Sequence, residues 1–142
     1  MKEIKQVVEA GVKNLFENTM GLKISVGKSV GKGFYTVSIP VSFETGVIEF
    51  YLFLKRPSLE AFAQHLFGDD EVSEGDLEDL SKEAANQIIG KAKNLLNEKN
   101  ESKYSLGTPT FLGSVENTAI KFNEKFIYKL NNRTFFIGYI IK

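Results

Sequence analysis

The amino-acid sequence predicts an α+β fold, with three helices packed on a mostly antiparallel sheet of about six strands. Apolar residues follow helical spacing in some stretches and strand-like alternation in others. These stretches come in the order helix, three strands, two helices, three strands, and runs of strands between helices favour an antiparallel sheet over a parallel one. The unit of a helix followed by three strands recurs, which predicts pseudo-symmetric halves. With 142 residues, the chain 1–142 is expected to form a single domain.

The first half begins with an amphipathic helix, predicted over Lys2–Glu17. Leu22–Lys28 alternates between apolar and polar residues and is predicted to be a strand. Phe34–Ser42 is rich in β-branched and aromatic residues, and its Pro40 favours an edge position or a bulge because proline has no N–H to donate. Val47–Lys55 is the most apolar strand and is expected to lie at the centre of the sheet.

The second half begins with a helix predicted over Pro57–Phe67, since proline suits the first turn of a helix. Its buried side is expected to comprise Leu59, Phe62, Ala63, Leu66 and Phe67. Ser73 and Asp76 can form a capping box for a long helix over Asp76–Asn97, and the polar segment Asn97–Gly107 is predicted to be a loop. The remaining predicted strands are Thr110–Val115, Ala119 to about Tyr128 with a possible turn at Asn123-Glu124, and, after a turn at Asn131-Asn132, Arg133–Ile141.

Composition excludes several classes of protein. The 18 basic and 18 acidic residues balance, so no electrostatic nucleic-acid or membrane surface is expected. The chain has no cysteine, which removes disulfides, thiolate catalysis and cysteine metal sites. The N-terminal segment is charged and amphipathic, unlike a signal peptide, and the apolar runs are too short to cross a membrane. We therefore expect a cytoplasmic protein without membrane insertion.

Two sequence features could indicate a chemical site, but each also has an ordinary structural interpretation. Gly27-Lys28-Ser29 resembles the end of a nucleotide-binding P-loop, but the earlier glycine of that motif is replaced by Leu22, and a strand is predicted to follow rather than a helix. A glycine-rich hairpin turn is the simpler interpretation. His65 is the only histidine and falls in the last turn of a predicted helix, where a capping or surface role is common. A single histidine provides no histidine pair for a metal and disfavours a Ser-His-Asp triad.

The helix predicted over Asp76–Asn97 has two different faces. Its apolar face carries Leu77, Leu80, Ala84, Ala85, Ile88, Ala92, Leu95 and Leu96. The opposite stripe carries Asp79, Glu83, Asn86 and Gly90. A glycine inside a helix costs about 1 kcal/mol relative to alanine, and asparagine is a poor interior helix residue that has no capping role here. A solvated helix face is the ordinary explanation, and a contact surface for another molecule is the alternative.

The pattern Asp79-x3-Glu83-x2-Asn86, followed after 22 residues by Pro109, resembles the signature of the CheC/CheX/FliY phosphatases of bacterial chemotaxis. The sequence Ile88–Ala92 also resembles the residues after the ExxN pair in these proteins. Proteins similar to CheC carry two ExxN sites. Here the first helix has Glu9-Ala10-Gly11-Val12 and Glu17-Asn18-Thr19-Met20, and neither supplies the asparagine. A single site is similar to CheX.

The resemblance implies a CheC/CheX-like fold and dephosphorylation of the phospho-aspartate of CheY or a related response regulator. Asn86 would orient the attacking water, because an amide both donates and accepts hydrogen bonds, and Glu83 would anchor a lysine of the regulator. Placement of the partner would involve Asp79, Gly90 and Pro109. The Mg²⁺ ion would belong to the regulator, so this chain would need no cofactor and no metal ligands of its own.

Two other functions stay open at this point. One is a non-catalytic scaffold or binding domain of the same fold in chemotaxis or flagellar signalling, and the other is a nucleotide-dependent enzyme, motivated only by Gly27-Lys28-Ser29. Members similar to CheX pair through their sheets, and we expect a homodimer here too. The long apolar strand Arg133–Ile141 supports this expectation if it is an exposed edge, because such an edge would otherwise favour aggregation.

Overall fold

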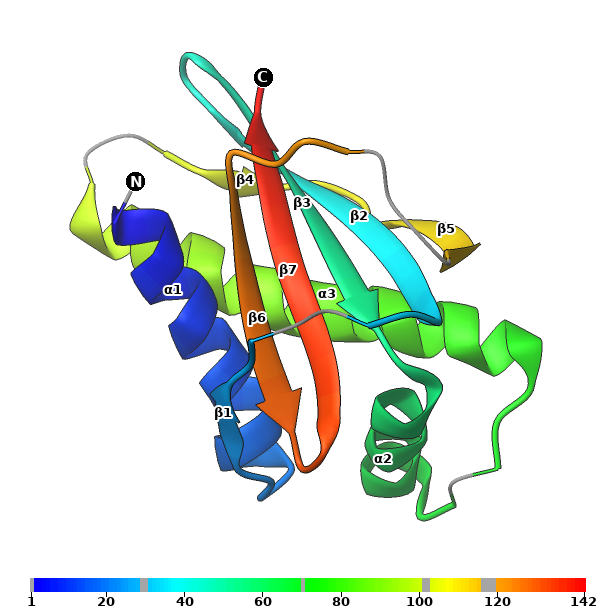
Figure 1. Ribbon diagram of the computed structural model, residues 1–142. Coiled ribbons are helices and arrows are strands. Elements are labelled where there is room, and N and C mark those ends of the chain that lie inside the picture. The colour runs from blue at the N-terminus through cyan, green and yellow to red at the C-terminus, as the bar shows by residue number, and fades with distance from the viewer. Residues whose placement is uncertain (1, 29–30, 70, 101–102, 116–119) are drawn as a thin grey trace.

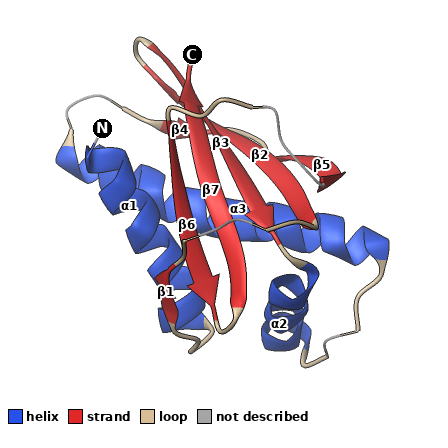
Figure 2. Cartoon of the chain, viewed as in Figure 1, coloured by secondary structure: helices blue, strands red, loops and turns tan. Residues whose placement is uncertain are grey.

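The computed structural model describes residues 2–28, 31–69, 71–100, 103–115 and 120–142 (Figures 1 and 2). Within these ranges the helices are α1 (Lys2–Lys13), which continues as the π-helical segment η1 (Asn14–Thr19), α2 (Arg56–Phe67) and α3 (Glu74–Lys99). The strands are β1 (Ile24–Val26), β2 (Phe34–Phe43), β3 (Gly46–Leu54), β4 (Ser105–Leu106), β5 (Thr110–Val115), β6 (Glu124–Leu130) and β7 (Arg133–Ile141).

The strands form one sheet in the order β1-β6-β7-β3-β2-β4, and β5 also pairs with β2. Every strand pair among the described residues is antiparallel. Each half of the chain contributes a central hairpin, β2–β3 or β6–β7. Each half also gives a strand to the hairpin of the other half, since β1 pairs with β6 and β5 pairs with β2. The predicted α+β class and the pseudo-symmetric halves are therefore confirmed.

Helices α1 and α3 pack against each other and lie on one face of the sheet (Figure 1). They cross at Gly11, where a Cβ atom would fall far inside contact distance of the Ile88 carbonyl oxygen. Only glycine lets the two backbones approach so closely. The core between the helices and the sheet is apolar, with Val8, Leu52, Ile88 and Ile137 all fully buried.

The other face of the sheet carries a smaller cluster of aromatic rings: Phe34, Phe53 and Phe136, with Tyr51, Phe122 and Ile127 packed against them. The rings of Phe53 and Phe136 stack with centroids 4.1 Å apart. Phe122 lies over Gly138, where a Cβ atom would come within 2.6 Å of its ring. In Figure 1, the segment that leads into β6 crosses this face, which none of the described helices covers.

No helix in the described ranges is both long enough and apolar enough to cross a membrane.

Several predicted boundaries are confirmed and others are wrong. Strand β7 has the predicted bounds, and β3 lies between β7 and β2, near the centre of the sheet as expected. The predicted loop Asn97–Gly107 contains the end of α3 and the short strand β4. The side chain of Asn97 explains this, because it accepts from the Tyr104 backbone N–H at 2.7 Å and donates to the Tyr104 carbonyl at 3.1 Å. These two hydrogen bonds hold the chain so that β4 lies beside β2.

The strand predicted from Ala119 begins only at Glu124, beside the turn that the sequence allowed at Asn123-Glu124. Ala119 lies outside the described residues, and β6 begins at Glu124 because Phe122 covers the sheet instead of joining it. Pro40 lies in β2, which has neighbours on both sides, so it is not at an edge. Its carbonyl accepts from the Gly107 N–H at 2.8 Å, in the gap between β4 and β5. The missing N–H of Pro40 therefore faces an interruption of the neighbouring strand, where no ladder bond is needed.

The expectation that Arg133–Ile141 is an exposed edge is wrong. Strand β7 pairs with β3 on one side and with β6 on the other. A continuous apolar run is typical of a strand inside a sheet as well as of an edge, and the run alone does not distinguish the two. The argument for a homodimer from this edge therefore fails.

We predict that Gly11→Ala lowers the free energy of unfolding by about 2 kcal/mol or more, because the added methyl group would push α1 away from the α3 backbone. Urea unfolding followed by circular dichroism measures this. The matched control is Gly75→Ala in the first turn of α3, where the nearest atom to a new Cβ is the Ser73 Oγ at 3.8 Å. Equal stability of the two variants would contradict the close crossing.

Candidate functional site

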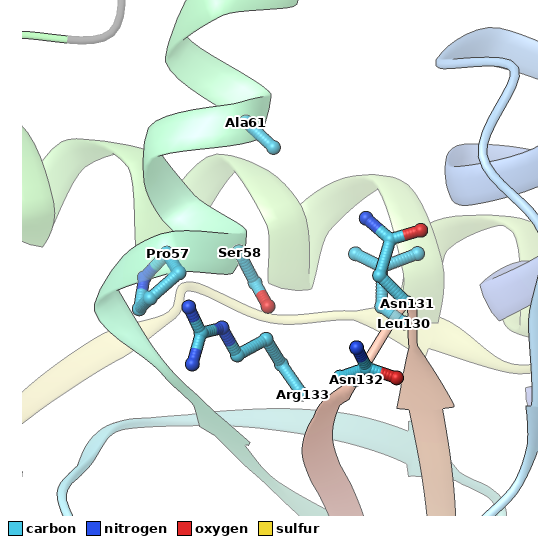
Figure 3. A pocket seen from close by; sticks show the side chains of 7 residues that line it. All are labelled: Pro57, Ser58, Ala61, Leu130, Asn131, Asn132 and Arg133. Atoms are coloured by element: carbon cyan, nitrogen blue, oxygen red, sulfur yellow. The ribbon is translucent and has the colours of Figure 1, made fainter.

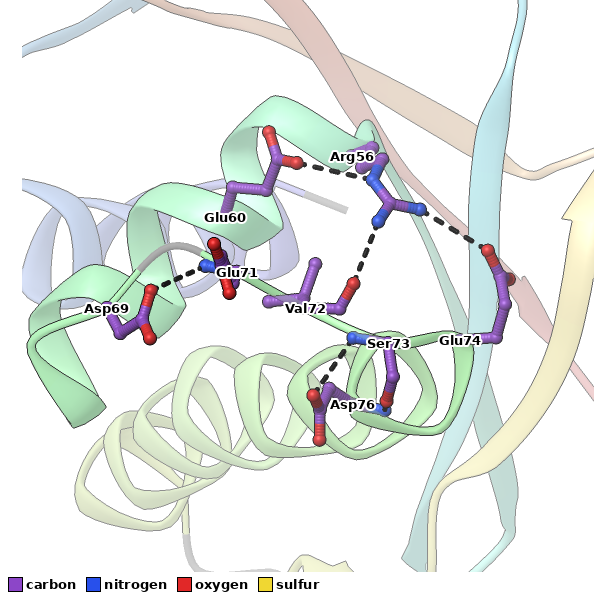
Figure 4. A network of polar contacts seen from close by, with 8 residues as sticks. All are labelled: Arg56, Glu60, Asp69, Glu71, Val72, Ser73, Glu74 and Asp76. Atoms are coloured by element: carbon purple, nitrogen blue, oxygen red, sulfur yellow. Dashed lines mark hydrogen bonds and ion pairs between the residues drawn. The ribbon is translucent and has the colours of Figure 1, made fainter.

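The N-terminus of α3 is held by local polar contacts (Figure 4). The Ser73 backbone N–H donates to Asp76 Oδ2 at 2.9 Å, and the Asp76 N–H donates to Ser73 Oγ at 3.1 Å. This is the predicted capping box. The hydrogen bond from the Ser73 backbone, and secondly that of its side chain, lower the pKa of Asp76, so its carboxylate is charged at neutral pH.

Arg56 links the start of α2 to the start of α3 (Figure 4). Its guanidinium donates to the Val72 carbonyl at 2.9 Å, to Glu60 Oε2 at 3.2 Å and to Glu74 Oε1 at 3.3 Å. Much of this cluster is solvent-exposed, so its contribution to stability is small. These contacts join the start of α2 to the segment that begins α3.

The two faces of α3 are arranged as the sequence predicts. Leu77, Ala85 and Ile88 on the apolar face are fully buried, and Ile89, which the sequence reasoning missed, is buried with them. On the opposite face Asp79 and Glu83 are exposed. Asn86 and Gly90 are partly exposed. We call Asp79, Glu83, Asn86 and Gly90 the α3 stripe.

The polar side chains of the α3 stripe have few partners within the protein. Glu83 Oε1 accepts one hydrogen bond, from Gln87 Nε2 at 3.0 Å. The nearby Lys82 is engaged with Glu78 at 3.0 Å instead. Neither the Asn86 amide nor the Asp79 carboxylate makes a side-chain hydrogen bond or ion pair with the part of the chain that the structure describes. The amide of Asn86 therefore keeps both its donor and its acceptor available for another molecule.

Gly90 is not required by packing inside the protein. A Cβ atom at this position would meet only Leu106 Cδ2, at the ordinary contact distance of 3.7 Å. Pro109 is partly buried between β4 and β5, and both of these strands contact α3. The structure thus brings the segment around Pro109 beside the helix that carries the other predicted site residues.

Two residues near the site contradict the sequence prediction. Leu66 and Phe67 were expected on the buried side of α2, but their side chains are 43% and 67% exposed. Helical spacing predicts which side of a helix faces inward, but not how far along the helix the neighbouring elements bury that side. These residues, together with Asp76, Asp79, Leu80 and Glu83, line a hollow of about 280 Å³.

A second hollow, of about 360 Å³, lies between the start of α2 and the β6–β7 turn (Figure 3). Pro57, Ser58 and Ala61 face Asn131 and Arg133 across it. The Ser58 hydroxyl is buried and has no hydrogen-bond partner among the described residues. This hollow shares no lining residue with the α3 stripe, so it is separate from the candidate site.

The alternative chemistry suggested by the sequence finds no support in the fold. Gly27 runs alongside β6, its N–H donating to the Ile127 carbonyl at 2.9 Å, and the next element is the strand β2. A P-loop needs a helix there. Ser29 lies outside the described residues. His65 is exposed in the last turn of α2. Among the described residues, no group of three or more His, Asp or Glu side chains converges as a metal site.

Several solved structures have this fold over nearly the whole chain. The chemotaxis protein CheX from Vibrio vulnificus matches with a TM-score of 0.82 and 14% sequence identity, covering 98% of this chain and 96% of that one. A CheC-like superfamily protein from a Shewanella species gives 0.74 and 17%, covering 99% and 97%. A CheX–CheY–BeF3–Mg complex from Borrelia burgdorferi gives 0.65 and 11%, covering 99% and 96%.

No protein-family model matches the sequence, and no curated protein is similar to it in sequence. The chain therefore shares its fold with CheX and CheC-like proteins, although few residues are identical. The resemblance inferred from the sequence to the CheC/CheX/FliY family is confirmed at the level of the fold.

We predict that Gly90→Ala raises the free energy of unfolding by about 0.5–1 kcal/mol, because alanine is the better helix former and the methyl group has room. Urea unfolding of the two proteins measures the difference. A loss of stability would mean that packing within the protein requires this glycine, and the argument for an external contact at Gly90 would fall.

Proposed function

We propose that this chain hydrolyses the phospho-aspartate of a CheY-like response regulator. The observation that carries the proposal is the open face of α3, where Glu83 and the unpartnered amide of Asn86 lie one helical turn apart. The shared fold supports it, since a CheX of the same fold has been solved in a complex with CheY, BeF3 and Mg. We further propose a role in chemotaxis or another two-component pathway, and a location in the cytoplasm with that partner.

The chemistry needs little from this chain. A water oxygen attacks the phosphorus, and the bond from phosphorus to the aspartyl oxygen breaks. Inorganic phosphate is released, the aspartate side chain of the regulator becomes a carboxylate again, and the water proton passes to the phosphate or solvent. Phosphoryl transfer of this kind depends on positioning and charge stabilisation. The Asn86 side chain accepts a hydrogen bond from the water through Oδ1 and donates to the phosphoryl group through Nδ2, which holds the water in line.

The other residues of the site position the regulator. Glu83 is exposed and accepts only from a neutral glutamine among the described residues, so its carboxylate is available to a lysine of the partner. Gly90 leaves space for the partner's backbone, and Asp79 and Pro109 border the same surface. A magnesium ion held by the regulator would offset the charge of the phosphoryl group. We propose that this chain supplies no ligand to that ion and needs no cofactor of its own.

The competing function is that of a non-catalytic scaffold of the same fold. Two substitutions distinguish the phosphatase from the scaffold. We predict that Asn86→Ala lowers the rate constant for loss of phosphate at saturating chain by about a hundredfold, because the water is no longer oriented. Glu83→Ala is predicted to weaken binding of the phosphorylated regulator by about tenfold. Release of phosphate from each phosphorylated receiver domain of the same organism, with and without the chain, is the measurement.

Asn94→Ala is the matched control, because Asn94 is an exposed asparagine two turns further along α3. It should keep the activity of the unsubstituted protein. An unchanged saturated rate in Asn86→Ala, together with unchanged binding of the phosphorylated regulator in Glu83→Ala, would show that the residues are wrongly assigned. Binding of a receiver domain without any faster loss of phosphate would favour the scaffold.

We also propose a homodimer, now on the basis of the sheet face that none of the described helices covers. The partly exposed Tyr51 and Ile127 pack against the aromatic cluster on this face. Ile140 lies on the same face because side chains alternate along β7. An apolar face of this kind favours association.

We predict twice the chain mass in light scattering at micromolar concentration and the single-chain mass for Ile140→Lys. A single-chain mass for the unsubstituted protein would overturn the proposal.

A further inference from the structure

We infer that the exposed end of α2 is a docking site for one long basic side chain of the response regulator. Its aliphatic stem would lie on Leu66 and Phe67, which we call the apolar step, and its charged head would reach Asp79 and Glu83. This inference rests on the proposed function, because the partner is the same regulator. It adds the apolar step, which lies on a different helix from the α3 stripe, to the surface that contacts the regulator.

The apolar step is exposed although the rest of its helix face is not. Leu59, Phe62 and Ala63 of α2 are at most 1% exposed, whereas Leu66 and Phe67 are 43% and 67% exposed. Of these, Phe67 gains most from contact with another molecule, since a covered aromatic ring removes a large apolar area from water. Exposed apolar side chains that are adjacent and rimmed by polar groups are typical of interaction sites.

The last turn of α2 is a fixed platform. Gly68 adopts the left-handed conformation at φ 73°, and its N–H donates to the Gln64 carbonyl at 2.9 Å. This is a standard helix C-terminal cap. Because the cap holds the turn that carries Leu66 and Phe67, little backbone freedom is lost when a partner packs on it.

All the charged residues that line the hollow beside the apolar step are acidic. Its apolar lining is Leu66, Phe67 and Leu80, and its polar lining is Asp76, Asp79 and Glu83. None of the described basic residues lines it. The capping hydrogen bonds lower the pKa of Asp76, and Asp79 has no ion-pair partner among the described residues. An occupant must therefore be cationic and also present apolar surface.

A lysine or arginine side chain meets both conditions, because its methylene stem packs on apolar surface while its head stays polar. The head of such a side chain is also attracted to an aromatic ring such as that of Phe67. The hollow of about 280 Å³ suits one side chain rather than a whole helix. It extends from Glu83 towards the start of α3, away from Asn86, so binding there leaves the water-orienting amide unobstructed.

The test uses the full chain and each receiver domain of the same organism, held in its active form with beryllofluoride and Mg²⁺. Titration calorimetry gives the dissociation constant, and phosphate release gives the rate at saturation. We expect Phe67→Ser to weaken binding by about tenfold or more and to change the saturated rate by less than about twofold. Asp79→Asn should also weaken binding. The double variant should lose less than the product of the two effects, because one side chain contacts both positions.

Val26→Ser is the control, since Val26 is 76% exposed on β1, at the opposite edge of the sheet from β4. It should bind like the unsubstituted protein. Unchanged binding in Phe67→Ser, with activity lost in Asn86→Ala, would overturn the inference and leave the proposed function standing. Binding that depends on Phe67 without faster loss of phosphate would support the docking site and overturn the phosphatase. If no receiver domain binds, both fail.

Discussion

The crossing of α1 and α3 at Gly11 determines where the helix that carries the α3 stripe lies. The missing side chain lets the two backbones meet at Ile88, which is buried between the positions of Asn86 and Gly90 along the helix. One side of that turn is thus immobilised against α1 and the core, while the other side presents the α3 stripe to solvent. A helix held by backbone contact has little freedom to rotate, so the side chain of Asn86 leaves the helix on its solvent-facing side. Positioning, which the proposed chemistry requires, comes from packing on the far side of the same helix.

Features set by neighbouring residues could be predicted from the sequence. The capping box of Ser73 and Asp76 needs two side chains three residues apart, and the two faces of α3 need only the helical period. The same holds for the hairpin at Asn131-Asn132, where Asn131 adopts the φ of 57° that such turns demand. Apart from Pro109, the candidate site lies on one helix, so its arrangement was open to sequence reasoning, although the roles of Glu83 and Asn86 came from a resemblance.

Features set by distant parts of the chain could not be predicted. The run Arg133–Ile141 has the same composition at an edge or inside a sheet, and only pairing with β3 and β6 makes β7 interior. The exposure of Phe67 depends on where α3 and the sheet end relative to α2, which no local pattern records. Phe122 leaves the expected strand because Gly138, further along the chain, offers a flat surface for its ring. In each case the deciding partner is remote in sequence.

The exchange of strands between the two halves has a consequence for folding during synthesis. Strand β7 comes after every other strand, yet it fills the place between β3 and β6 in the middle of the sheet. Until it has left the ribosome, the apolar strand β3 has one unpaired side, which is a template for contacts with other chains. Neither half can form its part of the sheet alone, because β2 of the first half pairs with β5 of the second, and β6 of the second half pairs with β1 of the first. We therefore expect nascent chains of this topology to be open to contacts with other chains until translation is nearly complete.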